Sequence, residues 1–334
     1  MSARASVTIR DVAAACGVSM MTVSRVVRGV DGVGEAVRAR VSQAVREMGY
    51  VPNGNARALV ETGSRLIGIS LPNLFNDVFA EVLGGMRHGL EQAGYASVID
   101  TTDYDPAREL SWVRRMGVWR PAALVLTGCD HDAGLRAALP PVPVMEIWDV
   151  TEAPLDICVG IDHRAAALML GRHVASLGYR RPAFVGLPEG LDRRADARVD
   201  GLREAFASTG ASALRRIGVE GESAFATGAR GLAALGDRPE EDVIFFHNDN
   251  TAFGGLCAAE RMGLSVPGDI GMVGFNGLEI ARVLPRTLTT CETPRRRIGL
   301  VAAQHLVARL AGVRAAAVTA LECRLVPGAT VRSQ

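Results

Sequence analysis

Along most of the chain, short apolar runs alternate with longer stretches in which apolar residues recur every three or four positions. The short runs predict strands buried on both faces, and the longer spacing predicts helices that cover them. The predicted strands are Leu66–Leu71, Ala96–Ile99, Ala122–Leu126, Val144–Ile147, Ile157–Gly160, Ala183–Leu187, Val243–Phe246, Ile270–Gly274 and Leu321–Val326. The predicted helices lie near residues 77–94, 106–117, 163–177, 195–210, 222–235, 250–263 and 294–312. This alternation predicts an α/β fold with parallel sheets.

The α/β region, residues 65–334, divides into two layered lobes. The first lobe is expected at about residues 65–160 and 292–320, and the second at about residues 162–290 and 322–334. Ligands of open α/β sheets bind beyond the carboxyl ends of the strands. Two lobes of this kind therefore predict a ligand cleft between them.

The first residues have a different pattern, which predicts three short helices in a domain of residues 1–52. Thr8 is a suitable N-cap for the first helix, and Gly17 supplies the positive φ that a sharp corner needs. Ser19 caps a second helix with a stripe of valines, and a third helix ends at Gly49. The outer side of the second helix is formed by Met20, Met21, Thr22, Ser24, Arg25 and Arg28. Such a pair of helices is typical of a helix-turn-helix that reads the major groove of DNA.

Residues 53–64 form a short connecting segment. Asn53 can cap a helix over about residues 54–60, but a helix this short that begins with Gly54 is marginal alone. Two interpretations stay open. The segment is either a flexible linker or a hinge that folds against DNA, with Leu59 as an apolar wedge in the minor groove.

The segments TIRDVAAACGVSMMTVSRVV and YVPNGNARAL resemble the head and hinge of the LacI/GalR family of bacterial repressors, and weaker similarity continues through the body. The resemblance implies a hinge helix, a two-lobed body like that of periplasmic binding proteins, and a homodimer on a palindromic double-stranded operator. It places Met20, Met21 and Arg25 at base edges, where Arg25 can bind a guanine. The implied DNA contacts are Thr8, Ser19, Met20, Met21, Thr22, Ser24, Arg25, Arg28, Asn53, Ala56, Arg57 and Leu59.

The same resemblance implies a small effector in the cleft. The positions that match the family's effector site are Phe79, Asp149, Arg198, Asn248 and Asn276. Arg194 is also expected at the effector site, because Arg193 and Arg194 can add positive potential at its rim, although a solvated loop is the alternative for this pair. Phe79 can stack on the apolar face of a sugar, and Arg198 can clamp an oxygen or a carboxylate. Exposed loop positions and helix caps are the alternative for these residues. Segments such as LPNLFNDVFAEVLGGM and GFNGLEIARVLPR are similar to the gluconate repressor branch, which favours a sugar acid such as gluconate over a neutral sugar or a nucleoside.

Charge supports this picture. The net charge is only +1, but residues 1–60 hold eight arginines and four acidic residues, which leaves the remainder acidic. A basic head is typical of a nucleic-acid binder. The histidines show no metal-ligand spacing, the cysteines form no CxxC pair, and no catalytic motif is present, so neither a cofactor nor a metal nor an enzyme is expected.

Location can also be predicted. Because the chain has neither an apolar signal segment nor a membrane-length apolar run, we expect a cytoplasmic protein without a membrane partner, bound at the nucleoid when on its operator. The alternatives from other classes are a cytoplasmic sugar-binding protein without a DNA function and a sugar-processing enzyme. The head argues against the first, and the lack of an acid/base pair argues against the second.

Overall fold

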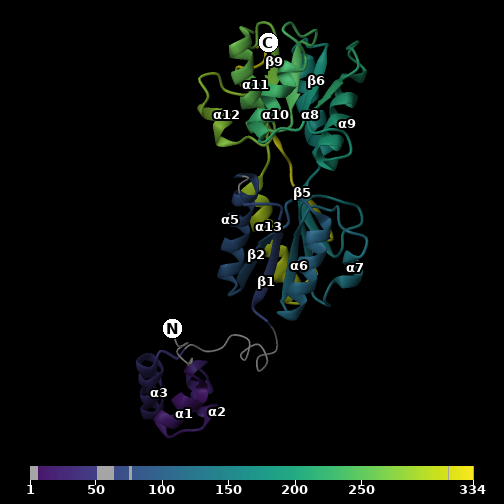
Figure 1. Ribbon diagram of the computed structural model, residues 1–334. Coiled ribbons are helices and arrows are strands. Elements are labelled where there is room, and N and C mark those ends of the chain that lie inside the picture. The colour runs from purple at the N-terminus through teal and green to yellow at the C-terminus, as the bar shows by residue number, and fades with distance from the viewer. Residues whose placement is uncertain (1–6, 51–63, 75–76, 315, 334) are drawn as a thin grey trace. The chain divides into compact units, whose positions relative to one another are not determined.

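The structure is a computed structural model (Figure 1). It describes residues 7–50, 64–74, 77–314 and 316–333. The chain divides into two compact units, Met1–Arg65 and Leu66–Gln334, called here the head and the body. The expected hinge residues Asn53, Ala56, Arg57 and Leu59 lie outside the described residues.

The head consists of the three predicted helices, α1 (Ile9–Cys16), α2 (Met20–Val27) and α3 (Glu35–Met48). Thr8 and Asp11 form a capping box at the start of α1. Gly17 and Gly49 end α1 and α3 in the left-handed conformation, with φ of 62° and 64°. The helices enclose a small core of Val12, Ala13, Cys16, Val23, Val26 and Val41.

The first lobe of the body is built on a six-stranded parallel sheet in the order β11-β5-β4-β3-β1-β2. Its strands are β1 (Leu66–Leu71), β2 (Ala96–Thr101), β3 (Ala123–Thr127), β4 (Val144–Asp149), β5 (Ile157–Ile161) and β11 (Val318–Ala320). Its helices are α5 (Asp77–Gln92), α6 (Pro106–Val118), α7 (Leu135–Ala138) and α13 (Arg295–Leu310). Because side chains alternate along a strand, Val125 of β3 joins the core that includes α5 and α13, whereas Leu124 joins the core with α6.

Helices α5 and α13 pack closely although about two hundred residues of chain separate them. Two glycines allow this approach. A Cβ atom on Gly299 would lie 2.0 Å from the Val82 carbonyl oxygen, and one on Gly85 would lie 2.3 Å from that of Arg296. A side chain at either position would push the two helices apart.

The second lobe is built on a four-stranded parallel sheet in the order β7-β6-β8-β9. Its strands are β6 (Pro182–Gly186), β7 (Arg215–Gly218), β8 (Val243–Phe246) and β9 (Gly271–Val273). Its helices are α8 (His163–Ser176), α9 (Arg193–Ala207), α10 (Ala224–Ala233), α11 (Asp249–Met262) and α12 (Glu279–Val283). Figure 1 shows this lobe at one end of the body, with the C-terminus on it.

Two short strands pair where the chain passes between the lobes. They are β10 (Thr290–Glu292) and β12 (Arg324–Val326), which are antiparallel. The predicted strand at Leu321–Val326 is therefore shorter than expected, and β7, β10 and β11 were not predicted. The other predicted strands are confirmed to within two residues at each end. No helix among the described residues is long and apolar enough to cross a membrane.

Candidate functional site

The first candidate site is the outer face of α2. Val23 and Val26 point into the head core, so the opposite face of this helix is left to solvent. Met20 and Met21 are 48% and 64% exposed, unusually high for large apolar side chains, and Arg25 is exposed beside them. The structure thus places the three predicted base-reading residues together on one accessible surface.

Three other expected DNA contacts of the head have local partners. The Ser19 hydroxyl accepts a hydrogen bond from the Thr22 backbone N–H at 3.1 Å, which caps α2. The Thr8 hydroxyl donates to Asp11 at 2.7 Å, and Arg28 Nε donates to the Ser24 carbonyl at 3.2 Å. Thr8 therefore stabilises the start of α1, and Ser19 and Arg28 stabilise the two ends of α2, which carries Met20 and Arg25. Whether they also contact DNA stays a prediction.

The second candidate site is a cavity of about 270 Å³ between the two lobes, called here the inter-lobe cavity. Five of the predicted effector residues line it: Phe79, Arg194, Arg198, Asn248 and Asn276. Its other lining residues are Val78, Tyr104, Trp148, His163, Leu187, Leu191, Asp192 and His247. Of these, the sequence analysis missed the aromatic residues, the two histidines and Asp192. Trp148, His163 and His247 lie at or just after the ends of predicted strands. Because ligands bind beyond the carboxyl ends of parallel strands, this position could have identified them from the sequence.

One wall of the inter-lobe cavity is aromatic. The Phe79 ring makes edge contacts with Tyr104 and Trp148, at centroid distances of 6.4 and 5.8 Å. Trp148 in turn lies 5.9 Å from the ring of His163. These rings come from α5, the loop after β2, the end of β4 and the start of α8. The wall suits the apolar face of a sugar ring or carbon chain.

The N-termini of three helices also contribute to the lining of the inter-lobe cavity. Asp192 caps α9 by accepting from the Arg194 N–H at 2.9 Å, and Asn248 caps α11 by accepting from the Thr251 N–H at 2.9 Å. His163 is the first residue of α8. The positive ends of these helix dipoles favour a negatively charged ligand. Because the Asn248 side-chain oxygen is used in capping, only its amide group is left to face a ligand.

Three non-glycine residues of the inter-lobe cavity have positive φ angles: Tyr104 at 61°, Trp148 at 84° and Asn276 at 106°. Such backbone conformations are unfavourable for residues with a side chain and are concentrated at functional sites. The surrounding fold holds these three residues in place, which aims their side chains at a common space.

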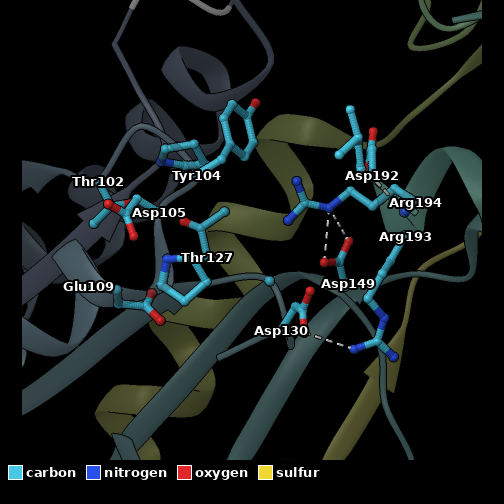
Figure 2. A pocket seen from close by; sticks show the side chains of 14 residues that line it. Thr102, Tyr104, Asp105, Glu109, Thr127, Asp130, Asp149, Asp192, Arg193 and Arg194 are labelled. Carbon is cyan, nitrogen blue, oxygen red and sulfur yellow. Dashed lines mark hydrogen bonds and ion pairs between the residues drawn. The ribbon is translucent and has the colours of Figure 1, made fainter. Parts of the chain in front are cut away.

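Asp149 lies behind this cavity and does not line it; it lines two neighbouring cavities, one of which is shown in Figure 2. Its carboxylate oxygens lie 2.8 and 2.9 Å from Arg194 Nε, and Oδ1 lies 3.0 Å from His163 Nε2. Burial alone would raise the pKa of Asp149, but the Arg194 guanidinium and the His163 ring hold it well below its usual range. The structure therefore presents Asp149 as the residue that positions Arg194, and its direct contact with an effector stays a prediction.

This ion pair joins the two lobes, because Asp149 ends β4 and Arg194 is in the first turn of α9. A second pair lies beside it, with Arg193 Nη1 3.1 Å from Asp130 Oδ1 after β3 (Figure 2). Gly128 lies close to the first pair. A Cβ atom there would be 2.6 Å from Arg194 Nη2, and its φ of 92° already favours glycine. Two consecutive arginines thus connect α9 to the ends of two adjacent strands of the other lobe.

Arg198 is the most deeply placed cation of the inter-lobe cavity, at 5% exposure. Its guanidinium lies 4.6 Å from the centre of the Phe275 ring, and Nη2 is 3.8 Å from Asp192 Oδ2. Burial lowers the pKa of Arg198. A guanidinium nevertheless keeps its charge in proteins. The Asp192 contact is too long for a hydrogen bond, so Asp192 balances this charge without accepting a hydrogen bond from it.

Four side-chain atoms of cavity residues are buried without a hydrogen-bond partner among the described residues. They are Arg198 Nε, His163 Nδ1, His247 Nδ1 and Asn276 Oδ1. An unpaired buried polar atom costs about 1–3 kcal/mol, so such a concentration indicates a site that a polar ligand completes. Within the described part of the chain, no group of three or more potential ligands is placed to hold a metal ion.

Comparison with known proteins shows the family of both parts of the chain. Residues 8–53 match the family described as "Bacterial regulatory proteins, lacI family", and residues 172–331 match the "Periplasmic binding protein-like domain". The chain is 34% identical over 307 residues to the HTH-type transcriptional regulator GntR of Escherichia coli K12, which covers 91% of this chain and 92% of that protein.

Solved structures give the same result. A LacI-family transcriptional regulator from Silicibacter pomeroyi is 38% identical, with a TM-score of 0.88 over 98% of this chain and 100% of that one. The lac repressor dimer bound to operator and the anti-inducer ONPF is 23% identical, with a TM-score of 0.86 over 98% of this chain and 100% of that one. The latter similarity supports the fold alone.

Proposed function

The chain belongs to the LacI family of bacterial regulatory proteins, and on that premise we propose that a sugar acid in the inter-lobe cavity controls its release from a palindromic operator. It is a DNA-binding transcriptional repressor with a periplasmic-binding-protein-like body, and it is not an enzyme. The effector class, the contact residues and the direction of control are the proposal.

The observation that carries the effector class is the set of four unpartnered polar atoms around Arg198. Hydroxyl groups of a polyol can donate to Asn276 Oδ1 and to a histidine nitrogen, and a carboxylate can accept from Arg198 Nε. The helix N-termini beside Arg198 favour the same negative charge. GntR-type relatives suggest a gluconate-type effector, which fits this chemistry.

The proposed mechanism is conformational. An effector that touches Arg198 in one lobe and Phe79 in the other changes the relative stability of the open and closed arrangements of the lobes. In a homodimer on a two-fold operator, that change reaches the hinge, and Leu59 leaves the minor groove. A regulator that acts on chromosomal DNA works in the cytoplasm, at the nucleoid while bound.

A neutral sugar or a nucleoside is the second candidate effector. The aromatic wall of Phe79, Tyr104 and Trp148 favours it, because stacking requires no charge. In addition, Asp149 and Asp192 already balance the two cavity arginines. Galactose and a nucleoside therefore belong in the test beside gluconate.

The experiment is fluorescence anisotropy of the full chain on labelled DNA from upstream of its own gene, with increasing salt and each effector. We expect tight binding that weakens steeply with salt and is relieved by gluconate alone. Binding that no sugar acid relieves would refute the effector class. Binding equal to that of a random duplex would refute this operator.

Matched variants on α9 test the site. Arg198→Gln should abolish the gluconate response without changing DNA affinity, because Arg198 lies in the body. Arg203→Gln is the control, since Arg203 is on the same helix, is 47% exposed and pairs with Asp200. An unchanged gluconate response in Arg198→Gln would remove Arg198 from the site.

A further inference from the structure

The charge balance of the inter-lobe cavity limits how an anion can enter it. Arg194 pairs with Asp149, and Arg198 faces Asp192, so these four groups sum to zero. This inference rests on the proposed function, in that a carboxylate is the expected ligand. One carboxylate added to a balanced, largely buried set leaves an excess negative charge, which is unfavourable in a poorly hydrated site.

A titratable group stands where it can compensate that charge. His247 lies between β8 and α11, with Nε2 3.4 Å from Asp192 Oδ2. Its Nδ1 is one of the buried atoms that have no partner within the described residues. Because His247 and Arg198 both approach the same Asp192 oxygen, a carboxylate bound at Arg198 would lie next to the His247 ring.

His247 is neutral in the unliganded protein, although the Asp192 carboxylate beside it favours the charged ring. The groups that face His247 come from two helices. They are Asp192, Arg194 and Arg198 from α9 and its cap, and His163 from α8. Burial, together with the Arg198 guanidinium, lowers the pKa of His247 to about 4. When neutral His247 directs its Nε2–H at Asp192, its Nδ1 carries no proton. A proton taken up by the ring would therefore bind at Nδ1.

We infer that His247 is the residue that selects an acid over a neutral sugar, by taking up one proton when a carboxylate binds beside Arg198. Protonated His247 then donates from Nδ1 to the carboxylate and from Nε2 to Asp192. The proton comes from solvent, so the liganded site returns to charge balance. A neutral analogue brings no negative charge, and it leaves His247 neutral.

The size of the effect follows from the geometry. At an effective dielectric constant of about 20, a unit negative charge about 4 Å away raises the pKa of a neighbouring base by about 3. His247 would then titrate near pH 7 in the complex. Affinity for the acid should therefore fall by roughly a hundredfold from pH 5 to pH 8, most steeply below pH 7.

The test is calorimetry of gluconate binding to the full chain, without DNA, in two buffers of different ionisation heat at pH 6.5. We expect an uptake of about 0.8 proton per gluconate, and none for glucitol, which has the same carbon chain without the carboxylate. In His247→Gln, the uptake should vanish and affinity should become nearly independent of pH. His88→Gln is the control, because His88 is exposed on α5 and bonded to Gln92, away from the cavity.

The outcomes separate this inference from the proposed function. Gluconate binding without proton uptake, or with an uptake that survives in His247→Gln, overturns the role of His247 and leaves the sugar-acid effector standing. Binding of neutral sugars alone overturns both. If the His247→Gln variant does not fold, the unmodified chain can still refute the inference, because gluconate binding without proton uptake excludes it.

Discussion

The two inter-lobe ion pairs allow a controlled measurement of what burial does to a salt bridge. Arg193–Asp130 and Arg194–Asp149 join the same helix to adjacent strand ends, and their shortest contacts are 3.1 and 2.8 Å. They differ in exposure. The side chains of the first pair are 71% and 69% exposed, and both side chains of the second are 18% exposed.

This difference predicts unequal coupling energies. Breaking a buried ion pair costs about 3–5 kcal/mol, because a charge remains without its partner, whereas exposed pairs contribute about 0.2–1 kcal/mol. Since the Arg194–Asp149 pair keeps some contact with solvent, we expect the low end, about 3 kcal/mol. For Arg193–Asp130 we expect about 0.5 kcal/mol or less.

The assay is a pair of double-mutant cycles on the free energy of unfolding, with Arg→Gln and Asp→Asn substitutions, followed by urea denaturation at pH 7.5. Asp149 is fully ionised there, because its pKa is below its usual range. In 1 M salt, where the screening length is about 3 Å, only the exposed pair should lose its coupling. Equal coupling energies for the two pairs, or a coupling below about 1 kcal/mol for Arg194–Asp149, would refute the reasoning.

Three further predictions concern the head and the second lobe. Val23→Ala should destabilise the head by about 2 kcal/mol and lower DNA affinity, because Val23 is fully buried in the head core. Val30→Ala is the control and should have neither effect, because Val30 is 44% exposed. Thermal melting of the full chain measures the difference. Arg25→Ala should cost about 1–3 kcal/mol on the operator and much less on a random duplex, and equal losses in anisotropy would contradict base reading. Asp249→Asn should change the pH dependence of stability. Burial raises the pKa of Asp249 to about 7, so the unmodified protein loses stability as the pH rises from about 4 to about 7, where Asp249 ionises in the unfolded chain first. Unfolding curves should therefore show the variant gaining stability relative to the unmodified protein over that range. A difference that does not change with pH would contradict this prediction.

Much of the fold could be predicted because its local signals agree with its packing. Strand β1, LIGISL, is buried along nearly its whole length, as a continuous apolar run predicts. Strand β7 was missed because RRIG lies at a sheet edge with two arginines and is partly exposed. Nothing in four such residues indicates a strand; the pairing with β6 determines it.

The candidate site was only partly predictable for a related reason. Asp149 was expected to bind the effector, but its partner Arg194 lies 45 residues further along the chain, and only the folded body brings them together. The roles of His163 and His247 depend on burial and on neighbours from other helices. Residue type and spacing along one segment carry no information about such contacts.

The packing of α13 against α5 has a consequence for how the protein is made. The ribosome releases β1 to β5 first, yet the sheet edge β11 and the covering helix α13 come from residues 295–320. The stretch of chain for the second lobe, residues 163–283, is nearly continuous, so most of that lobe can fold before the first is complete. Until synthesis is almost finished, the apolar face of α5 around Val82 and Met86 has no cover from α13. A prematurely terminated chain would carry the head on an unfinished lobe, and chaperones or proteases would be expected to recognise that exposed face.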